Sequence, residues 1–154
     1  MVNKWLILAL CVVSFSGCSL LHEHIRDLVV EDIDHAYFER TDIAETTAYK
    51  LYENQYKDEI AKIGYLINLV RYSPYTFYRN GITAPGNTAA EVLDYKVHKF
   101  FDEITTVEDF IEKVGSYSRT SGKEYYIIYP DHHRCPIKNV YYNELKRLYS
   151  YTAR

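Results

Sequence analysis

Residues 131–135 near the carboxyl end of the chain, DHHRC, hold every residue type that catalysis by a cysteine nucleophile requires. A catalytic thiolate needs a histidine as base and a third group that orients the histidine. Adjacent residues seldom converge on one point, however, and prolines on both sides constrain this segment as a loop. We therefore interpret it as an exposed polar loop. The catalytic alternative is a small enzyme that uses Arg79, His132, His133 and Cys135.

The chain lacks the motifs of the common enzyme and metal-binding classes. It has no GxSxG nucleophile motif and no HExxH zinc motif, and the SGK at residues 121–123 lacks the first glycine of a phosphate-binding loop. A zinc site needs more ligands than one cysteine beside two histidines, and His22 and His24 alone are a weak metal pair. We expect no enzyme activity, no cofactor and no metal ligand.

Arg79 stands immediately before Asn80 and Gly81, the dipeptide that most strongly predicts a tight β-hairpin turn. An arginine presented at such a turn could bind a carboxylate or phosphate group through two parallel hydrogen bonds. A structural salt bridge to a neighbouring helix is the favoured alternative for Arg79.

The first residues have the order of a secretory signal peptide: a positive start with Lys4, then the apolar run WLILALCVVSF at residues 5–15, then Ser16 and Gly17. A permanent membrane-spanning helix takes roughly 20 apolar residues, so this run is too short. We expect residues 1–17 to be removed. Cleavage between Gly17 and Cys18 would leave an amino-terminal cysteine, whose thiol can carry a diacylglyceryl group.

Lipidation of Cys18 predicts a membrane anchor, because each buried CH₂ of an acyl chain contributes about 0.8 kcal/mol. Phe15 departs from the Leu, Val or Ile usual at that position of a lipoprotein cleavage site, and Ser19 favours transport onward to the outer membrane. With Cys11 removed and Cys18 acylated, Cys135 is the last thiol, so the mature chain can form no internal disulfide. Cys135 is expected to be buried, with a free reactive thiol as the alternative.

Composition indicates a globular domain with 47% apolar residues and a nearly balanced charge of 18 Lys+Arg against 21 Asp+Glu. This balance argues against a nucleic-acid partner. The chain has 17 tyrosines but only 6 phenylalanines. Tyrosine has a large apolar body with a polar tip, and here it is expected to replace Phe and Leu in part of the core.

Residues 18–41 are predicted to be a lipidated amino terminus and tether, and residues 42–154 a single domain. Apolar residues recur at helical spacing from residue 41 to Pro74, which gives one helix or two helices broken near Glu53 and Asn54. The stripe of this region consists of Tyr52, Tyr56, Ile60, Ile63, Ile67 and Val70.

A hairpin at residues 76–83 is followed by a helix that Thr88 and Glu91 would cap, and by another that Thr106 opens. EYYIIYP at residues 124–130 is typical of a strand, and a short helix follows the DHHRC loop. The predicted fold class is α+β, mostly helical, with a minimal antiparallel sheet of the hairpin and one strand.

Three segments, FYRNG (77–81), AAEVLDYKVHKF (89–100) and ITTVEDFIEKVGSYSRTSGKEYYI (104–127), occur in an order that resembles the YfeK-like family of small exported Gram-negative proteins. The resemblance covers residues 59–149 and implies export and a compact fold, without an established activity. Two positions depart from the family pattern, Pro74-Tyr75 in place of a cysteine and Tyr141-Tyr142 in place of Trp-Leu. The signature residues, mostly turn formers and caps, are Phe77, Arg79, Asn80, Gly81, Lys96, Thr106, Glu108, Phe110, Ile111, Ser118, Ser121, Gly122, Lys123 and Tyr125.

These observations favour a non-enzymatic lipoprotein of the cell envelope, held by its acyl chains in the outer membrane and facing the periplasm. Such a domain would bind another envelope protein or serve a structural role. The first alternative is an exclusion or immunity lipoprotein that blocks a receptor, channel or toxin. The second is a small periplasmic enzyme that uses the arginine and DHHRC residues named above.

Overall fold

The computed structural model of the chain describes residues 37–38 and 41–154, all of which belong to one structural unit, Asp32–Arg154. The predicted signal peptide, Cys18 and most of the predicted tether lie outside the described residues. The elements in chain order are the 3-10 helix η2 (Ile43–Glu45), α2 (Thr47–Glu53), α3 (Glu59–Tyr72), β1 (Thr76–Arg79), β2 (Ile82–Pro85), α4 (Gly86–Lys99), the 3-10 helix η3 (Phe101–Glu103), α5 (Val107–Asp109), the π-helix η4 (Phe110–Gly115), β3 (Tyr126–Ile128), β4 (Arg134–Pro136) and α6 (Ile137–Thr152).

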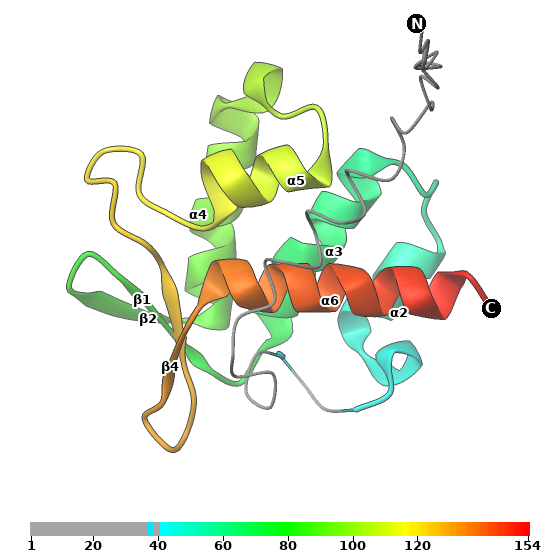
Figure 1. Cartoon of the computed structure of the whole chain (residues 1–154), viewed down its shortest axis with the longest axis horizontal. Coiled ribbons are helices and arrows are strands. Elements are labelled where there is room, and N and C mark those ends of the chain that lie inside the picture. Colours follow the sequence, from blue (N-terminus) through cyan, green and yellow to red (C-terminus); the bar gives the residue numbers. More distant parts are fainter. Residues whose placement is uncertain (1–36, 39–40) are drawn as a thin grey trace, which may run out of the picture. The chain divides into compact units, whose positions relative to one another are not determined.

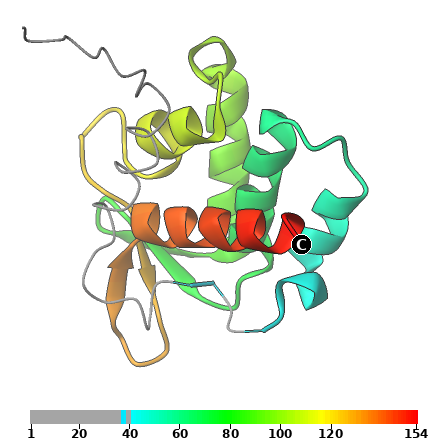
Figure 2. The same cartoon turned by 45° about the vertical axis from the view of Figure 1, so that its right-hand side comes forward.

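The helices gather beside a small antiparallel sheet, which lies on one side of the domain with α2 on the other (Figures 1 and 2). Strand order in the sheet is β2-β1-β3-β4. Helix α3 is central, because it contacts α2, α4 and α6. The mostly helical α+β fold predicted from the sequence is therefore confirmed.

The region from residue 41 to Pro74 forms two helices, which selects the second of the two sequence predictions. Asp58 begins the new helix, since its Oδ1 accepts a 2.8 Å hydrogen bond from the backbone N–H of Ala61. Tyr56 lies in the connection between α2 and α3 and is 88% exposed, and Ile60 is half exposed. Their placement in the buried stripe was wrong, because the stripe does not continue across the break.

The predicted hairpin is confirmed, with Asn80 and Gly81 both at positive φ (51° and 89°) between β1 and β2. This pair of angles matches the twist of the flanking strands and explains the choice of these two residue types. The DHHRC segment differs from its prediction, because its carboxyl end forms β4 and pairs with β3, where Cys135 lies opposite Ile127. The sheet therefore has one strand more than expected.

Helix α4 begins at Gly86 and not at Thr88, so the predicted capping box is wrong. A side chain at Gly86 would bring its Cβ to 2.2 Å from the carbonyl oxygen of Val70, so only glycine lets α4 begin this close to α3. The cap at Thr106 is confirmed, since its Oγ1 accepts a 3.0 Å hydrogen bond from the backbone N–H of Asp109. Helix α6 is longer than the short helix expected.

The core lies between α3, α4, α5, η4, α6 and the inner face of the sheet. It includes Phe38, a residue of the stretch 18–41, whose backbone N–H donates a 3.0 Å hydrogen bond to the buried carboxylate of Glu144 on α6. Other fully buried side chains are Tyr65, Leu66, Val70, Val107, Phe110, Ile111, Val114, Ile127, Val140, Tyr141 and Leu148.

Candidate functional site

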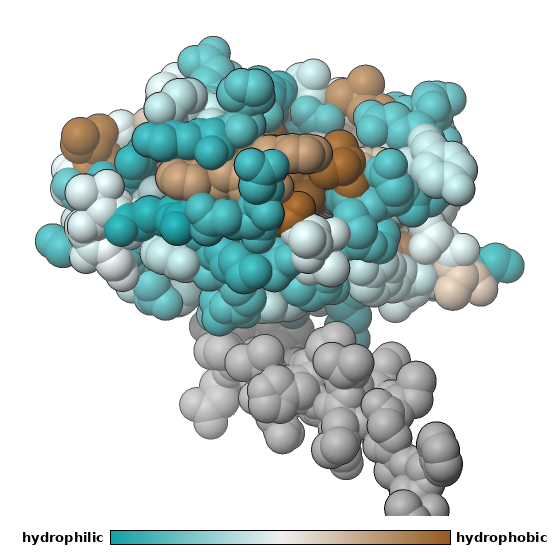
Figure 3. Space-filling model, turned by 90° about the horizontal axis from the view of Figure 1, so that it is seen from above, coloured by the Kyte–Doolittle hydropathy of each residue, from teal (hydrophilic) through white to brown (hydrophobic). Residues whose placement is uncertain are grey.

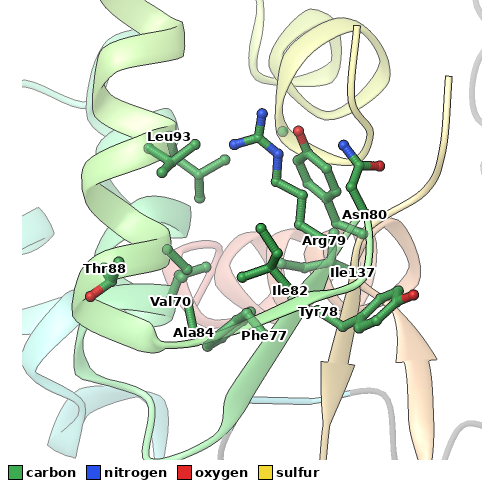
Figure 4. Close-up of a pocket in the computed structure, with 14 residues that line it drawn as sticks. Val70, Phe77, Tyr78, Arg79, Asn80, Ile82, Ala84, Thr88, Leu93 and Ile137 are labelled. Carbon is green, nitrogen blue, oxygen red and sulfur yellow. The ribbon is translucent and has the colours of Figure 1, made fainter. Parts of the chain in front are cut away.

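A cavity of about 330 Å³ lies between the β1–β2 hairpin, α4 and the first residue of α6. The hairpin forms one edge of the sheet, and α4 follows directly after β2, so the hairpin and α4 face each other across this space (Figure 4). Most of the lining is aliphatic or aromatic, and no Asp or Glu is among the described residues that line it. The apolar residues that matter below are Val70, Phe77, Ile82, Val92, Leu93 and Ile137.

Arg79, the last residue of β1, supplies the charged group of this cavity. Its side chain extends from the strand toward the α4 side, where Leu93 lies, whereas Tyr78 points to the other face of the sheet (Figure 4). The guanidinium lies 5.4 Å from the ring centroid of Tyr125. Among the residues that the structure describes, Arg79 forms no salt bridge. The favoured expectation of a salt bridge to a neighbouring helix is therefore wrong for this part of the chain.

Lys96 on α4 is buried behind the same tyrosine, with 6% of its surface exposed. Its Nζ donates hydrogen bonds to the carbonyl oxygens of Val114 and Tyr117 (2.9 Å for Tyr117) and to Tyr125 Oη (3.3 Å). Nζ also lies 4.8 Å from the Tyr125 ring centroid. The Val114 carbonyl belongs to the carboxyl end of the π-helix η4, where backbone oxygens lack helical partners and attract a cation, and Tyr117 follows two residues after that helix.

Burial is the main cause that lowers the pKa of Lys96 to about 8, and the positive charges of Arg79 and Arg119 contribute to the same shift. Arg119 is itself neutralised, because its guanidinium forms a 2.8 Å salt bridge with Glu103 and lies over the ring of Phe100. Arg79 and Lys96 have no such carboxylate among the described residues. One end of the cavity therefore has an excess of positive charge.

Tyr125 contacts both cations, since the Arg79 guanidinium and Lys96 Nζ lie 5.4 Å and 4.8 Å from its ring centroid, and it is 7% exposed. Burial raises the pKa of its hydroxyl, although Arg79 opposes the rise. The hydroxyl stays protonated near neutral pH and can take part in hydrogen bonds. The sequence named Tyr125 as a signature residue, and its contact with two cations was not foreseen.

The remaining signature residues on turns hold the frame of the site. Ser121 Oγ donates a 2.8 Å hydrogen bond to Asn80 Oδ1, which ties the hairpin turn to the 118–123 turn. Gly122 has a positive φ of 67°, and its N–H donates to the carbonyl of Ser118 (2.7 Å). Lys123 is exposed in the same turn. The structure thus brings both turns of the signature to one end of the domain.

The DHHRC segment lies at the other end of the sheet. In the register of the sheet, Phe77 pairs with Ile127 and Ile127 pairs with Cys135, so the β3–β4 turn lies beyond the first residue of β1. Arg79 is at the opposite end of β1. Cys135 is buried, as expected, and His133 stacks on Tyr129 at 6.4 Å. Arg79 therefore does not converge with His132, His133 and Cys135, and the single-site enzyme alternative loses its geometry.

Neither a metal-binding cluster nor a membrane-spanning helix is found in the described part of the chain. No group of three or more His, Cys, Asp or Glu side chains there could hold a metal ion. No described helix is both long enough and apolar enough to cross a membrane. On the face drawn in Figure 3, hydrophobic residues occupy a limited area within a mostly hydrophilic surface.

Comparison with known proteins gives one match. The sequence model of a family of unknown function, DUF5329, matches residues 57–149, more than half of the chain. The chain belongs to this family. No curated protein and no solved structure matches it. The DUF5329 region runs from just before the Asp58 cap of α3 into α6, and it contains every residue of the cavity described above. The resemblance to the YfeK-like family stays a prediction.

Proposed function

We propose that the protein is a lipid-anchored binding protein of the bacterial cell envelope, and that its DUF5329 domain binds a ligand in the cavity beside Arg79 without catalysing a reaction. One observation carries the binding role: an apolar cavity with an arginine at its edge that no described carboxylate neutralises. Concave apolar sites with a few polar groups of this kind are typical of ligand-binding sites.

The separation of the reactive side chains supports a binding role over an enzymatic one. A nucleophile must lie within hydrogen-bond reach of its base. Cys135 is buried on β4, and the turn that holds the two histidines lies at the far end of the sheet from Arg79. The cavity itself contains no nucleophile beside a base among its described lining residues.

The envelope location rests on the amino-terminal sequence. Residues 1–17 have the charge, apolar run and small residues of a lipoprotein signal, and Cys18 supplies the thiol for acylation. Ser19 favours the outer membrane, with the domain facing the periplasm. An anchor of this kind would hold the domain at a surface where other envelope components are concentrated.

Metabolic labelling tests the anchor. Cells that produce the full chain are supplied with radioactive palmitate, and the amino-terminal peptide of the purified protein is identified by mass spectrometry. We expect label on the unchanged protein and on the control Cys135→Ala, and an acylated peptide that begins at Cys18. Label on Cys18→Ala, or an unchanged protein without acylated Cys18, would contradict the proposal.

Photocrosslinking in intact cells tests the binding role separately. A photoreactive amino acid replaces Ile82, which lines the cavity and is 71% exposed. The matched control places it at Tyr56, which is 88% exposed in the α2–α3 connection. We expect a discrete adduct at position 82 that Arg79→Gln weakens, and none at position 56. Equal adducts at the two positions, or none at either, would contradict use of this cavity.

A further inference from the structure

We infer that the ligand of this cavity is a small organic acid with one carboxylate and an apolar body, bound with its carboxylate at Arg79. The inference rests on the proposed binding role and adds the chemical class of the ligand. It follows from three properties of the site: the character of the lining, the state of the nearby cations, and the volume available.

The apolar lining of the cavity favours a ligand whose main part is apolar. Aliphatic side chains from three helices and from the hairpin face the cavity, among them Val70, Ile82, Leu93 and Ile137. Polar side chains are few: Arg79 and Asn80 lie at the hairpin turn, and Thr88 lies on the α4 side (Figure 4). A fully hydrated sugar or nucleotide would lose hydrogen bonds to water here that this lining does not replace. A hydrocarbon chain or ring gains free energy by leaving water.

The cations select an anionic head group. Two other arginines of the domain have carboxylate partners: Arg71 pairs with Asp94, and Arg119 pairs with Glu103. Arg79 has none among the described residues, and it lies close enough to Lys96 to lower the pKa of that amine. A carboxylate beside Arg79 would neutralise this excess charge and could accept two parallel hydrogen bonds from the guanidinium. An amine would meet repulsion and find no acidic lining residue.

The volume selects a small molecule. About 330 Å³ is at the lower end of the range for ligand cavities, so one compact apolar group fills it. The cavity is open at the hairpin, where Ile82 is exposed, and a ligand can enter without a change in the core. The closed end is formed by Val70, Phe77 and Ile137, which are parts of the core or border it.

A pair of probes of equal shape tests the inference. The acid 3-phenylpropionate and its neutral amide, 3-phenylpropanamide, differ in charge and little in size. Each is titrated into the purified full-length protein by calorimetry at neutral pH. A hydrogen-bonded charge pair contributes enough for the acid to bind about tenfold more tightly than the amide.

Two variants locate this difference. Arg79→Gln should reduce the acid-to-amide ratio to about one, with little effect on the amide. The matched control is Arg134→Gln, which removes a second sheet arginine that also lies over a tyrosine ring, at 4.9 Å from Tyr78. Arg134 itself is not among the described residues that line the cavity, so this control should keep the tenfold ratio. Circular dichroism and the melting temperature verify that each variant is folded.

The outcomes separate this inference from the proposed function. Equal affinity of the unchanged protein for acid and amide would leave the cavity as a binding site but overturn the anionic class. A preference that survives in Arg79→Gln would overturn the role of Arg79. Binding of neither probe would overturn the ligand class, while adducts at Ile82 in cells would still support a binding role for the cavity. The ratio of the affinities for acid and amide is measured on the unchanged protein without any variant. The anionic class is therefore still tested if Arg79→Gln does not fold.

Discussion

Replacing Lys96 by methionine should abolish an increase in stability that the unchanged domain shows between pH 7 and pH 10. Lys96 is buried, and the folded domain lowers its pKa from 10.5 to about 8. Burial is the largest cause, and the charges of Arg79 and Arg119 add to it. In the unfolded chain the amine is hydrated and keeps its ordinary pKa.

The sign follows from proton binding in the two states. Between pH 8 and 10.5 the unfolded chain holds more protons on this lysine than the folded domain does, so the free energy of unfolding rises with pH across that window. A difference of this size between the two pKa values amounts to about 2 kcal/mol of added stability between pH 7 and pH 10. From about pH 9 the buried tyrosines oppose this rise, since burial raises the pKa of Tyr65 and Tyr141 above the ordinary 10.0 and the unfolded chain loses their protons first. The unchanged protein and the lysine variants share this opposing effect, so the difference between them reports Lys96.

Urea unfolding followed by far-ultraviolet circular dichroism at pH 7, 8, 9 and 10 measures the effect. Lys96→Met keeps the length of the side chain but leaves the carbonyls of Val114 and Tyr117 without this donor, so its absolute stability at pH 7 is not the readout. The readout is the change with pH, which should be lost in Lys96→Met and kept in Lys123→Met, where the lysine is exposed. A parallel rise in Lys96→Met and the unchanged protein would refute the reasoning, because another group would then carry it.

Three smaller predictions concern stability and can be checked by thermal unfolding of each variant. Gly86→Ala should destabilise the domain by about 2 kcal/mol or more, because the new Cβ would lie 2.2 Å from the carbonyl oxygen of Val70 and α4 would have to move away from α3; an unchanged melting temperature would contradict this. Thr106→Ala should cost about 1 kcal/mol through loss of the helix cap, and Thr106→Ser should restore most of it. Tyr141→Phe should stabilise the domain by about 1 kcal/mol, because the buried hydroxyl of Tyr141 has no hydrogen-bond partner among the described residues; a clear loss of stability would contradict this reasoning.

Local signals in the sequence predicted the parts of the fold that depend on a few neighbouring residues. Asn80 and Gly81 determine their turn through their own backbone angles. Thr106 caps the three-residue helix α5 through a single hydrogen bond to a residue three positions away. The break between α2 and α3 was one of the two alternatives predicted from the sequence. The periodic pattern alone did not identify Asp58 as the residue that caps α3.

Elements that depend on partners far away in the sequence could not be predicted in this way. Strand β4 has three residues and exists because Cys135 pairs with Ile127. The start of α4 is determined by the close approach of Gly86 to Val70, so the local capping signal at Thr88 is overridden.

The candidate site also combines features that local sequence predicts with features that depend on distant parts of the chain. Arg79 was identified from its place beside the turn, but its lack of a carboxylate depends on which helices face it. Lys96 is three residues after Leu93 and so lies on the buried face of α4, where the binary pattern does not place a lysine. Of the two carbonyls that accept its hydrogen bonds, that of Val114 belongs to a π-helix, whose altered hydrogen bonding has no sequence signal of its own.

The signature residues therefore divide into two sets with different physical roles. Asn80, Ser121 and Gly122 maintain the frame through turn geometry and one hydrogen bond between turns. Arg79 and Lys96 do not stabilise the frame by ion pairing with any described carboxylate, and their mutual repulsion opposes folding. A pair of like charges beside an apolar cavity destabilises the fold, so stability alone does not explain it. A bound anion would neutralise the positive charge and so offset this repulsion. The stability of the domain and the occupancy of its cavity are therefore coupled through the same two side chains.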